Sequence, residues 1–258
     1  MHSYSLKGLI RYAKKLRIFL LDLLFPKECL GCLKEGTYLC DVCYNDIQLN
    51  TVQSCPVCNK NNFLGSFCKN CSTEASLSGI LVASDYKNKL LSKVIKSYKY
   101  KFVRELKDPL GSLLIDFSRN LIETRKNNYF WHSSEKRLIN DFQNVLIIPV
   151  PLHKKRLRWR GFNQSEDLAN IFSSKLKLEI NTNQLKRHKF KKPQTSLGRE
   201  ERFKNIKNSF TWDGKPLENK NIILIDDVST STATLCECSK VLKANGAKQI
   251  LGLVLAHG

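Results

Sequence analysis

The sequence predicts an α/β fold in which a parallel sheet carries helices on both faces, preceded by a small zinc-ribbon module. Two observations predict it: strand and helix signals alternate after residue 78, and four CxxC pairs are compressed into residues 29–71. At 258 residues and 42% hydrophobic composition, the chain is long enough to bury one large core and to carry an appendage.

The alternating elements follow one another over residues 79–255. Apolar runs predict buried strands at residues 79–86, 144–152 and 221–225, a weaker strand at 178–185, and a final strand that ends near 255. Helical spacing of apolar residues predicts helices at 89–100, about 103–125, about 164–177, and from about 233 to a cap at Asn245 and Gly246. The polar stretch 126–141 and the basic stretch 187–205 are expected to be loops. Such alternation places ligands beyond the carboxyl ends of the parallel strands.

Three regions are predicted along the chain. Residues 1–26 have basic residues before apolar residues at helical spacing, which predicts an amphipathic helix packed on the rest of the protein; a membrane-surface helix is the alternative. Residues 27–78 are predicted to form a double zinc ribbon, and residues 79–258 the α/β domain. Asp22 interrupts an apolar run far shorter than the ~20 residues that span a bilayer. We therefore expect no transmembrane segment and a cytoplasmic location.

The four CxxC pairs indicate two structural zinc ions. Each pair lets a tight turn direct two thiolates at one metal, and two pairs complete a tetrahedral shell of four sulfurs. Spacing leaves sequential and crossed pairing open, and a disulfide framework is the competing interpretation, disfavoured because no signal peptide is recognised. The predicted ligands are Cys29, Cys32, Cys40, Cys43, Cys55, Cys58, Cys68 and Cys71. Since all ligands are protein thiolates, the zinc ions are expected to fold the segment and not to catalyse.

Charge indicates polyanionic partners, either nucleic acid or a phosphorylated ligand. The formal charge is +20, of which residues 1–78 contribute +3 and residues 79–258 contribute +17. Trp159, Phe162 and the tyrosines among Lys96, Lys99 and Lys101 are candidates for stacking on bases of single-stranded DNA. The alternatives are a solvated lysine-rich surface and a plain amphipathic helix.

The stretch "NIILIDDVSTSTATL", residues 221–235, predicts a sugar-phosphate site. A buried strand ends in Asp226 and Asp227 and leads through hydroxyl residues into a helix that begins near Ala233. The N-H groups and positive dipole at a helix N-terminus attract phosphate, and carboxylates beside it accept hydrogen bonds from sugar hydroxyls. Helix capping alone is the alternative. The residues expected around the phosphate are Thr230, Ser231, Thr232, Ala233 and Thr234.

This stretch resembles the 5-phosphoribosyl-1-pyrophosphate (PRPP) motif of type I phosphoribosyltransferases. The stretches "IIPVPLHKKRLRWRGFNQSEDLA" at 147–169 and "KKPQTSLGREERFKNIKNSF" at 191–210, together with the four CxxC pairs, look like the ComF family of competence-associated, phosphoribosyltransferase-like proteins. The resemblance covers nearly the whole chain from Cys29. It implies a type I phosphoribosyltransferase-like fold and a part in handling incoming single-stranded DNA during natural transformation.

The same resemblance implies roles for individual residues. Asp226 and Asp227 would be the catalytic pair that holds the ribose hydroxyls, residues 230–234 would wrap the 5-phosphate, and residues 187–204 would be a flexible flap. Magnesium would accompany PRPP on its pyrophosphate. The expected pyrophosphate partners are Lys154, Lys155, Arg156, Arg158 and Arg160, with Arg199 and Arg202 from the flap.

One residue departs from the family pattern, and two functional classes follow. Thr232 stands where the family's loop usually has Gly, which narrows or reshapes the phosphate cradle unless the hydroxyl compensates as a donor. In one class the chain binds PRPP and handles single-stranded DNA, alongside proteins of the competence machinery. In the other it is an active phosphoribosyltransferase of nucleotide metabolism with no nucleic-acid role.

Overall fold

The computed structural model describes residues 8, 26–62, 65–71, 76–126, 144–190 and 199–258. Within them the chain forms two compact units, Met1–Asp46 and Ile47–Gly258, so that the division falls inside the segment predicted as one double zinc ribbon. Apart from Gly8 and Pro26, the predicted N-terminal helix lies outside the described residues. None of the helices in these ranges has the length and apolar character that crossing a membrane requires.

The first unit, where it is described, is a small turn-rich segment around the first two CxxC pairs. Its backbone folds back through a bridge between Glu28 and Glu35, and one short helix, α2 (Asp41–Asn45), follows. Gly36, at φ +98°, adopts a left-handed conformation that side chains disfavour. This geometry brings residues 29–34 and 40–43 together.

The second unit contains the predicted parallel sheet. Its order is β3 (Gly79–Asp85), β9 (Gln249–His257), β8 (Asn221–Ser229), β4 (Val145–Pro149) and β5 (Glu179–Ile180), and every neighbouring pair is parallel. The apolar runs that form β4 and β8 suit strands buried on both faces. The fold class is therefore confirmed, although the strand expected at 178–185 is only two residues long in this sheet.

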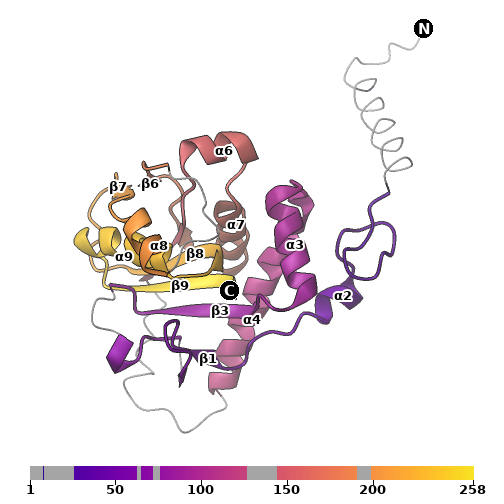
Figure 1. Cartoon of the computed structure of the whole chain (residues 1–258), viewed down its shortest axis with the longest axis horizontal. Helices are drawn as coiled ribbons and strands as arrows, with labels where there is room; N and C mark the ends of the chain where they lie inside the picture. Colours follow the sequence, from indigo (N-terminus) through magenta and orange to yellow (C-terminus); the bar gives the residue numbers. More distant parts are fainter. Residues whose placement is uncertain (1–7, 9–25, 63–64, 72–75, 127–143, 191–198) are drawn as a thin grey trace. The chain divides into compact units, whose positions relative to one another are not determined.

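Helices cover both faces of the sheet, with α8 (Arg199–Ile206) and α9 (Ala233–Ala244) in front and α4 (Lys107–Lys126) and α7 (Gln164–Leu176) behind in Figure 1. Alternate residues of β8 point to opposite faces. Ile222 and Leu224 pack in one core cluster with Leu242 of α9, whereas Ile225, on the other face, is also fully buried. Helix α3 (Lys89–Tyr100) occupies the predicted residues 89–100.

One sequence prediction needs correction. The stretch 187–205 is not wholly a loop, because α8 begins at Arg199; Phe203 and Ile206, three residues apart on this helix, pack against the core. Before it, β6 (Leu185–Arg187) pairs with β7 (Phe210–Trp212) in an antiparallel hairpin. The basic run after β4 is a short helix, α6 (Lys154–Arg160), which ends at Gly161. The remainder of the predicted flap (191–198) and most of the predicted loop at 126–141 lie outside the described residues.

The segment that carries the third and fourth CxxC pairs covers the edge of β3 that no other strand of the sheet covers. It holds two short strands, β1 (Gln53–Ser54) and β2 (Asn61–Asn62), and the 3-10 turn η1 (Lys69–Cys71). The side chain of Gln53 accepts a hydrogen bond from the N-H of Val82 at 2.8 Å and donates one to its carbonyl at 3.2 Å, as a neighbouring strand would. Ile80 N-H donates to the Gly65 carbonyl at 2.9 Å. An edge strand that would otherwise attract another chain is thus paired.

The absence of a side chain at Gly65 allows this close approach. We predict that Gly65→Ala lowers the free energy of unfolding of the second unit by more than the strain of a positive φ alone explains. A Cβ at Gly65, which has φ +61°, would lie 1.9 Å from the Ile80 carbonyl oxygen, and that oxygen belongs to the backbone of β3. Gly246→Ala is the matched control: it has φ +91° but its nearest neighbour would be 3.7 Å away. Denaturant unfolding should show a loss of about 1–2 kcal/mol for the control and a larger loss for Gly65→Ala. Equal losses would contradict the close docking of this segment on β3.

Two zinc sites and a candidate ligand site at the sheet edge

The eight predicted cysteine ligands form two separate groups of four. Cys29, Cys32, Cys40 and Cys43 converge in the first unit, and Cys55, Cys58, Cys68 and Cys71 converge in the second, with the sulfurs of each group within 4.8 Å of one another. The sequential pairing is therefore the observed one. Representative Sγ–Sγ distances are 3.6 Å, close to the edge of a tetrahedron with zinc–sulfur bonds of ~2.3 Å. The donor set fits two structural zinc ions.

Each group also contains a thiol that is prepared to ionise. Burial raises the pKa of Cys29, but hydrogen bonds from the backbone N-H groups of Cys40, Cys32 and Gly31 outweigh it and lower the pKa to about 6. The pKa of Cys55 is lowered to about 6 in the same way. No disulfide joins the ten cysteines of the described chain. With four protein sulfurs per ion no open position would remain, so zinc ions bound here would be structural.

Asp226 and Asp227 lie within the last residues of β8 and are both held in place. Asp226 Oδ1 accepts hydrogen bonds from Ser165 Oγ at 2.7 Å and from the Asp227 N-H at 2.9 Å. Asp227 is only 3% exposed, and its Oδ2 lies 2.7 Å from Lys99 Nζ of α3. Burial raises the pKa of Asp226, while Ser165 and nearby cations oppose that rise. The pair is therefore a fixed acidic element at the carboxyl end of the central strand.

More cations than acids surround this pair. Burial lowers the pKa of Lys99 to about 8; the charge of Asp226 opposes this, and Arg160 and Arg156 add to it. Arg187, at the end of β6, also has its pKa lowered by burial, and it interacts with both Arg156 and Asp226. We call Lys99, Arg156, Arg160 and Arg187 the cation cluster. Its four positive charges exceed the two carboxylates, which favours an anionic ligand.

Two donors of the cation cluster, Arg160 Nε and Arg187 Nε, have no hydrogen-bond partner among the described residues, and neither does Ser229 Oγ at the end of β8. Asp227 Oδ2 also accepts no hydrogen bond, although it forms the ion pair with Lys99. Arg160 is 7% exposed, and its Nη1 donates to Gln164. Buried donors left unsatisfied cost free energy, and native structures rarely leave them so. Two guanidinium donors and one hydroxyl near an acidic pair are groups that a phosphorylated sugar would satisfy.

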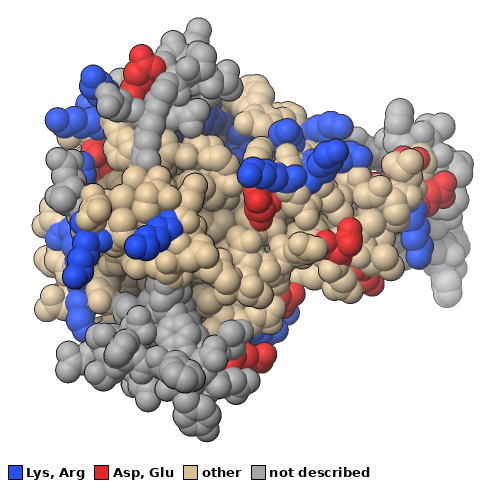
Figure 2. All heavy atoms as spheres, turned by 60° about the horizontal axis from the view of Figure 1, so that its bottom comes forward, with Lys and Arg blue, Asp and Glu red and all other residues tan. Residues whose placement is uncertain are grey.

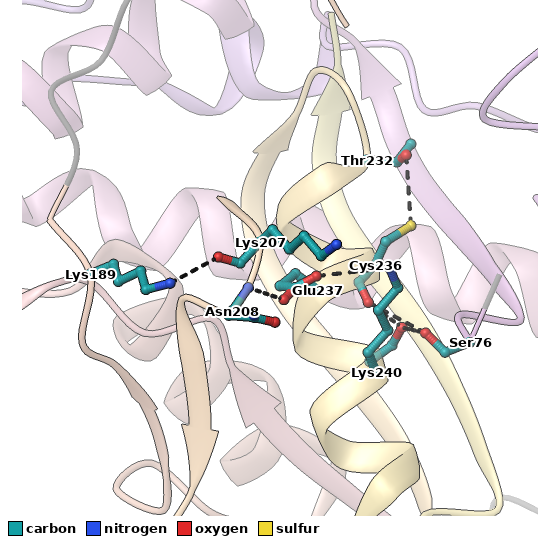
Figure 3. Close-up of polar contacts among 9 residues, drawn as sticks. Ser76, Lys189, Lys207, Asn208, Thr232, Cys236, Glu237 and Lys240 are labelled. Atoms are coloured by element: carbon teal, nitrogen blue, oxygen red, sulfur yellow. Dashed lines mark hydrogen bonds and ion pairs between the residues drawn. The ribbon is translucent and has the colours of Figure 1, made fainter. Parts of the chain in front are cut away.

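The loop from Thr230 into α9, the candidate phosphate site, contains one strained residue. Thr232 is the residue before α9 and adopts φ +60°, which is unfavourable for a β-branched side chain. It is 3% exposed, and its hydroxyl accepts from Cys236 Sγ at 3.8 Å instead of capping the helix (Figure 3). The first N-H groups of α9 have no partner within the helix. The backbone conformation that glycine normally supplies is thus kept here by threonine.

Helix α9 is anchored on the side shown in Figure 3. Glu237, 7% exposed, accepts a hydrogen bond from the Asn208 N-H at 2.5 Å, and Ser239 shares one with Ser76 at 2.6 Å. Lys240 lies 3.9 Å from Glu237. These contacts hold α9 in place, and the first turn of α9 forms part of the loop at residues 230–234.

The predicted pyrophosphate residues of α6 separate into two groups. Arg156 is half-buried and Arg160 is buried, and both belong to the cation cluster. Lys154, Lys155 and Arg158 are exposed. Arg199 and Arg202 belong to α8, but their side chains lie outside the described part of the chain. Sequence reasoning did not find Ser165 or Arg187, and it did not assign Lys99 to the site, because only the fold brings them to Asp226 and Asp227.

The expected stacking residues also divide by burial. Phe162 is 6% exposed and Tyr98 is fully buried, their rings lying 5.0 Å apart, so the prediction that they stack on bases was wrong. Tyr100, Phe102 and Trp159 are 60%, 44% and 61% exposed. We call these three the α3–α6 aromatic surface, since Phe102 and Trp159 lie 5.3 Å apart and Arg160 lies 5.6 Å from the Tyr100 ring.

Positive charge is spread over the surface. The face drawn in Figure 2 carries Lys and Arg side chains in several separate groups, with Asp and Glu side chains near some of them. Among the described residues visible on this face, Lys and Arg form no single continuous track.

A parallel α/β domain with an acidic pair at its central strand, together with two four-cysteine sites, defines an α/β protein with zinc-binding cysteine modules. A double zinc ribbon family matches residues 20–75. Competence protein F of Haemophilus influenzae is 37% identical over 106 residues, which are 40% of this chain and 46% of that protein. DNA utilization protein YhgH of Escherichia coli O157:H7 is 33% identical over 40% of this chain and 45% of its own length.

The match to these two relatives therefore spans less than half of their length. Competence protein ComFC of Bacillus subtilis is 26% identical over 237 residues, 90% of each chain. Together these comparisons support assignment of the chain to the ComF family.

We predict that the chain binds two zinc ions and that the two sites differ in what their loss affects. Cys32→Ser should remove one zinc and leave the unfolding of the second unit unchanged, because that site lies wholly in the first unit. Cys58→Ser should remove the other and lower the stability of the second unit, since the segment covering β3 depends on it. Elemental analysis measures the zinc content of each variant, and denaturant unfolding measures the stability of its second unit. Fewer than about 1.5 zinc per reduced wild-type chain would contradict the double site.

The buried Lys99 predicts a specific pH dependence of stability. Its pKa of about 8 in the folded chain lies below the ordinary value of 10.5, so the unfolded chain binds this proton more tightly. Wild-type stability should therefore rise relative to Lys99→Met between pH 8 and 10.5, by an amount on the order of 2 kcal/mol. Lys96→Met, which removes an exposed lysine of the same helix, is the control. Unfolding free energies of wild type and Lys99→Met that run parallel across this window would refute the buried charge.

Proposed function

We propose that this protein binds PRPP at the loop of residues 222–235 and acts in handling incoming single-stranded DNA during natural transformation. The names of its relatives, competence protein and DNA utilization protein, support the DNA role. The observation that carries PRPP binding is the acidic pair held beside unsatisfied buried donors at the start of a helix.

Each part of PRPP has residues suited to it. Asp226 and Asp227 accept hydrogen bonds from the two ribose hydroxyls, the former held by Ser165. The loop at residues 230–234 and the first turn of α9 receive the 5-phosphate through N-H groups and hydroxyls. The cation cluster, of which Arg156 and Arg160 belong to α6, receives the pyrophosphate, where magnesium would neutralise further charge.

Lys99 has a separate role in this proposal. In the free chain its ammonium group neutralises Asp227 across 2.7 Å. An arriving ribose competes for the same carboxylate, and the pyrophosphate offers Lys99 an alternative anion. When PRPP binds, Lys99 exchanges the Asp227 carboxylate for the pyrophosphate. Lys99 therefore stays paired with an anion, and the free-energy cost of an unpaired buried cation is avoided. The same arrangement stabilises a departing pyrophosphate, so an active phosphoribosyltransferase remains the second candidate.

The DNA role rests on the α3–α6 aromatic surface and the exposed cations beside it. Large exposed aromatic side chains that lie together offer stacking platforms for bases, and lysine and arginine contact phosphates. Lys154, Lys155 and Arg158 share α6 with Trp159 and are exposed. Single-stranded DNA in the cytoplasm, with its bases unpaired, is the ligand that this combination suits.

Replacing the acidic pair tests PRPP binding. Asp226→Asn with Asp227→Asn keeps size and most hydrogen bonding, so the fold should survive, while affinity for PRPP with magnesium falls at least about tenfold, or 1.4 kcal/mol. Asp213→Asn, at an exposed aspartate paired with Lys186, is the control. Isothermal titration measures all three proteins. Unchanged affinity in the double variant would show that the ribose is held elsewhere.

Single substitutions on α6 test the DNA role. Trp159→Ala should weaken binding of a labelled single-stranded oligonucleotide by about 1–3 kcal/mol without changing its salt dependence, because stacking carries no charge. Neutralising Lys154, Lys155 and Arg158 should instead flatten the salt slope by about 2 units. Leu157→Ala, 39% exposed on the same helix, is the control. Fluorescence anisotropy at several salt concentrations separates these effects; no binding at low salt would refute the DNA role.

A further inference from the structure

A pocket of about 650 Å³ lies at the carboxyl ends of β3 and β9, apart from the acidic pair and the cation cluster. One wall is the segment of residues 50–59, which includes the third CxxC turn. The other wall is residues 82–87 at the end of β3, together with His257 and Gly258. All these residues belong to the second unit. A volume of this size suits a small organic ligand, for which pockets span roughly 300–1,000 Å³.

The walls are fixed in position without a ligand. Gln53 makes both of its amide hydrogen bonds to the backbone of Val82, and the Asn50 N-H donates to the Ala83 carbonyl at 2.8 Å. Ser84, 2% exposed, donates from Oγ to the Gln48 carbonyl at 2.7 Å. Ligand binding therefore costs little ordering of these walls.

The chemistry of the lining selects a neutral, planar, hydrogen-bonding ligand. Asp85 places a carboxylate in one wall. Its Oδ1 accepts a hydrogen bond from the Lys87 N-H, which leaves Oδ2 for a donor of the ligand. Among the described residues of the lining, Lys87 is the one lysine or arginine, so a phosphate finds little neutralisation here. Ser54 and Asn59 add groups that both donate and accept, and Tyr86 contributes a flat ring, which Lys96 Nζ approaches to 5.9 Å from its centroid. A nucleobase carries neighbouring donors and acceptors on a flat ring and meets each of these features.

The pocket is next to the candidate sugar-phosphate loop along the sheet. His257 pairs with Ser229 in the register of β8 and β9, and the Gly258 N-H donates to the Ser229 carbonyl at 3.0 Å. Ser229 is the residue that precedes the loop.

We propose that this pocket, formed jointly by the second zinc module and the edge of the sheet, binds one unpaired nucleobase. This goes beyond the proposed function, since it needs neither PRPP nor a contact with the DNA backbone. The base comes from a free nucleoside or from single-stranded DNA, and both sources share the chemistry that the lining recognises.

Titration with the four deoxynucleosides, without PRPP, tests the pocket. Val52 is 59% exposed on its rim, so Val52→Trp should fill it and weaken nucleoside binding at least about tenfold. Val42→Trp, at a valine 79% exposed in the first unit, is the matched control and should bind as wild type does. Asp85→Asn, whose oxygen can still accept from Lys87, is a second variant expected to alter the preference among the four bases.

The outcomes distinguish the two sources of the base, and they distinguish failure of this proposal from failure of PRPP binding. Weaker binding of both nucleosides and a single-stranded oligonucleotide by Val52→Trp shows that a DNA base enters; loss for nucleosides alone shows a free heterocycle. Melting and zinc content confirm that the variants fold. The proposal is overturned if wild type binds no nucleoside up to its solubility, or if neither Val52→Trp nor Asp85→Asn changes binding. A failure of PRPP binding leaves this result untouched, because PRPP is absent.

Discussion

Parallel strands end at the same edge of a sheet, and this constraint determines where the ligand chemistry of the protein lies. Because β4, β8 and β9 are parallel and in register, the turn into α6, the acidic pair and the residues His257 and Gly258 all emerge at one edge. Helices on both faces leave that edge as the place where backbone N-H groups and polar side chains meet solvent. The cation cluster, the candidate phosphate loop at residues 230–234 and the pocket beside β3 therefore lie along this edge.

Buried charge gives that edge its chemical character. Removing a lysine and several arginines from water is costly, and the lowered pKa of Lys99 expresses that cost. The carboxylates of Asp226 and Asp227 offset only part of this free-energy cost. The unsatisfied Nε atoms of Arg160 and Arg187 are donors to which an anionic ligand would bind. A site of this kind sacrifices stability in the free chain and regains it on binding.

The sequence alone was informative where neighbouring residues determine structure. The CxxC spacing predicted two groups of four cysteines, and the apolar run at 222–225 followed by Asp226 and Asp227 predicted a buried strand with acids near its carboxyl end, although β8 continues to Ser229. It failed where distant segments meet. Ser165, Lys99 and Arg187 come from three different elements, and nothing in their local spacing relates them to Asp226. Phe162 resembled an exposed stacking residue because only the packing of Tyr98 against it shows its burial. Helix α8 was missed because Pro and Gly precede it and it has only two apolar anchors.

The central claim is that the carboxyl edge of β8 holds PRPP. Isothermal titration of the zinc-loaded chain with PRPP and magnesium, with and without single-stranded DNA, tests it most directly. The account predicts saturable binding of one PRPP per chain, accompanied by proton uptake near pH 8 as the anion raises the pKa of Lys99. Absence of saturable binding at millimolar PRPP would contradict it.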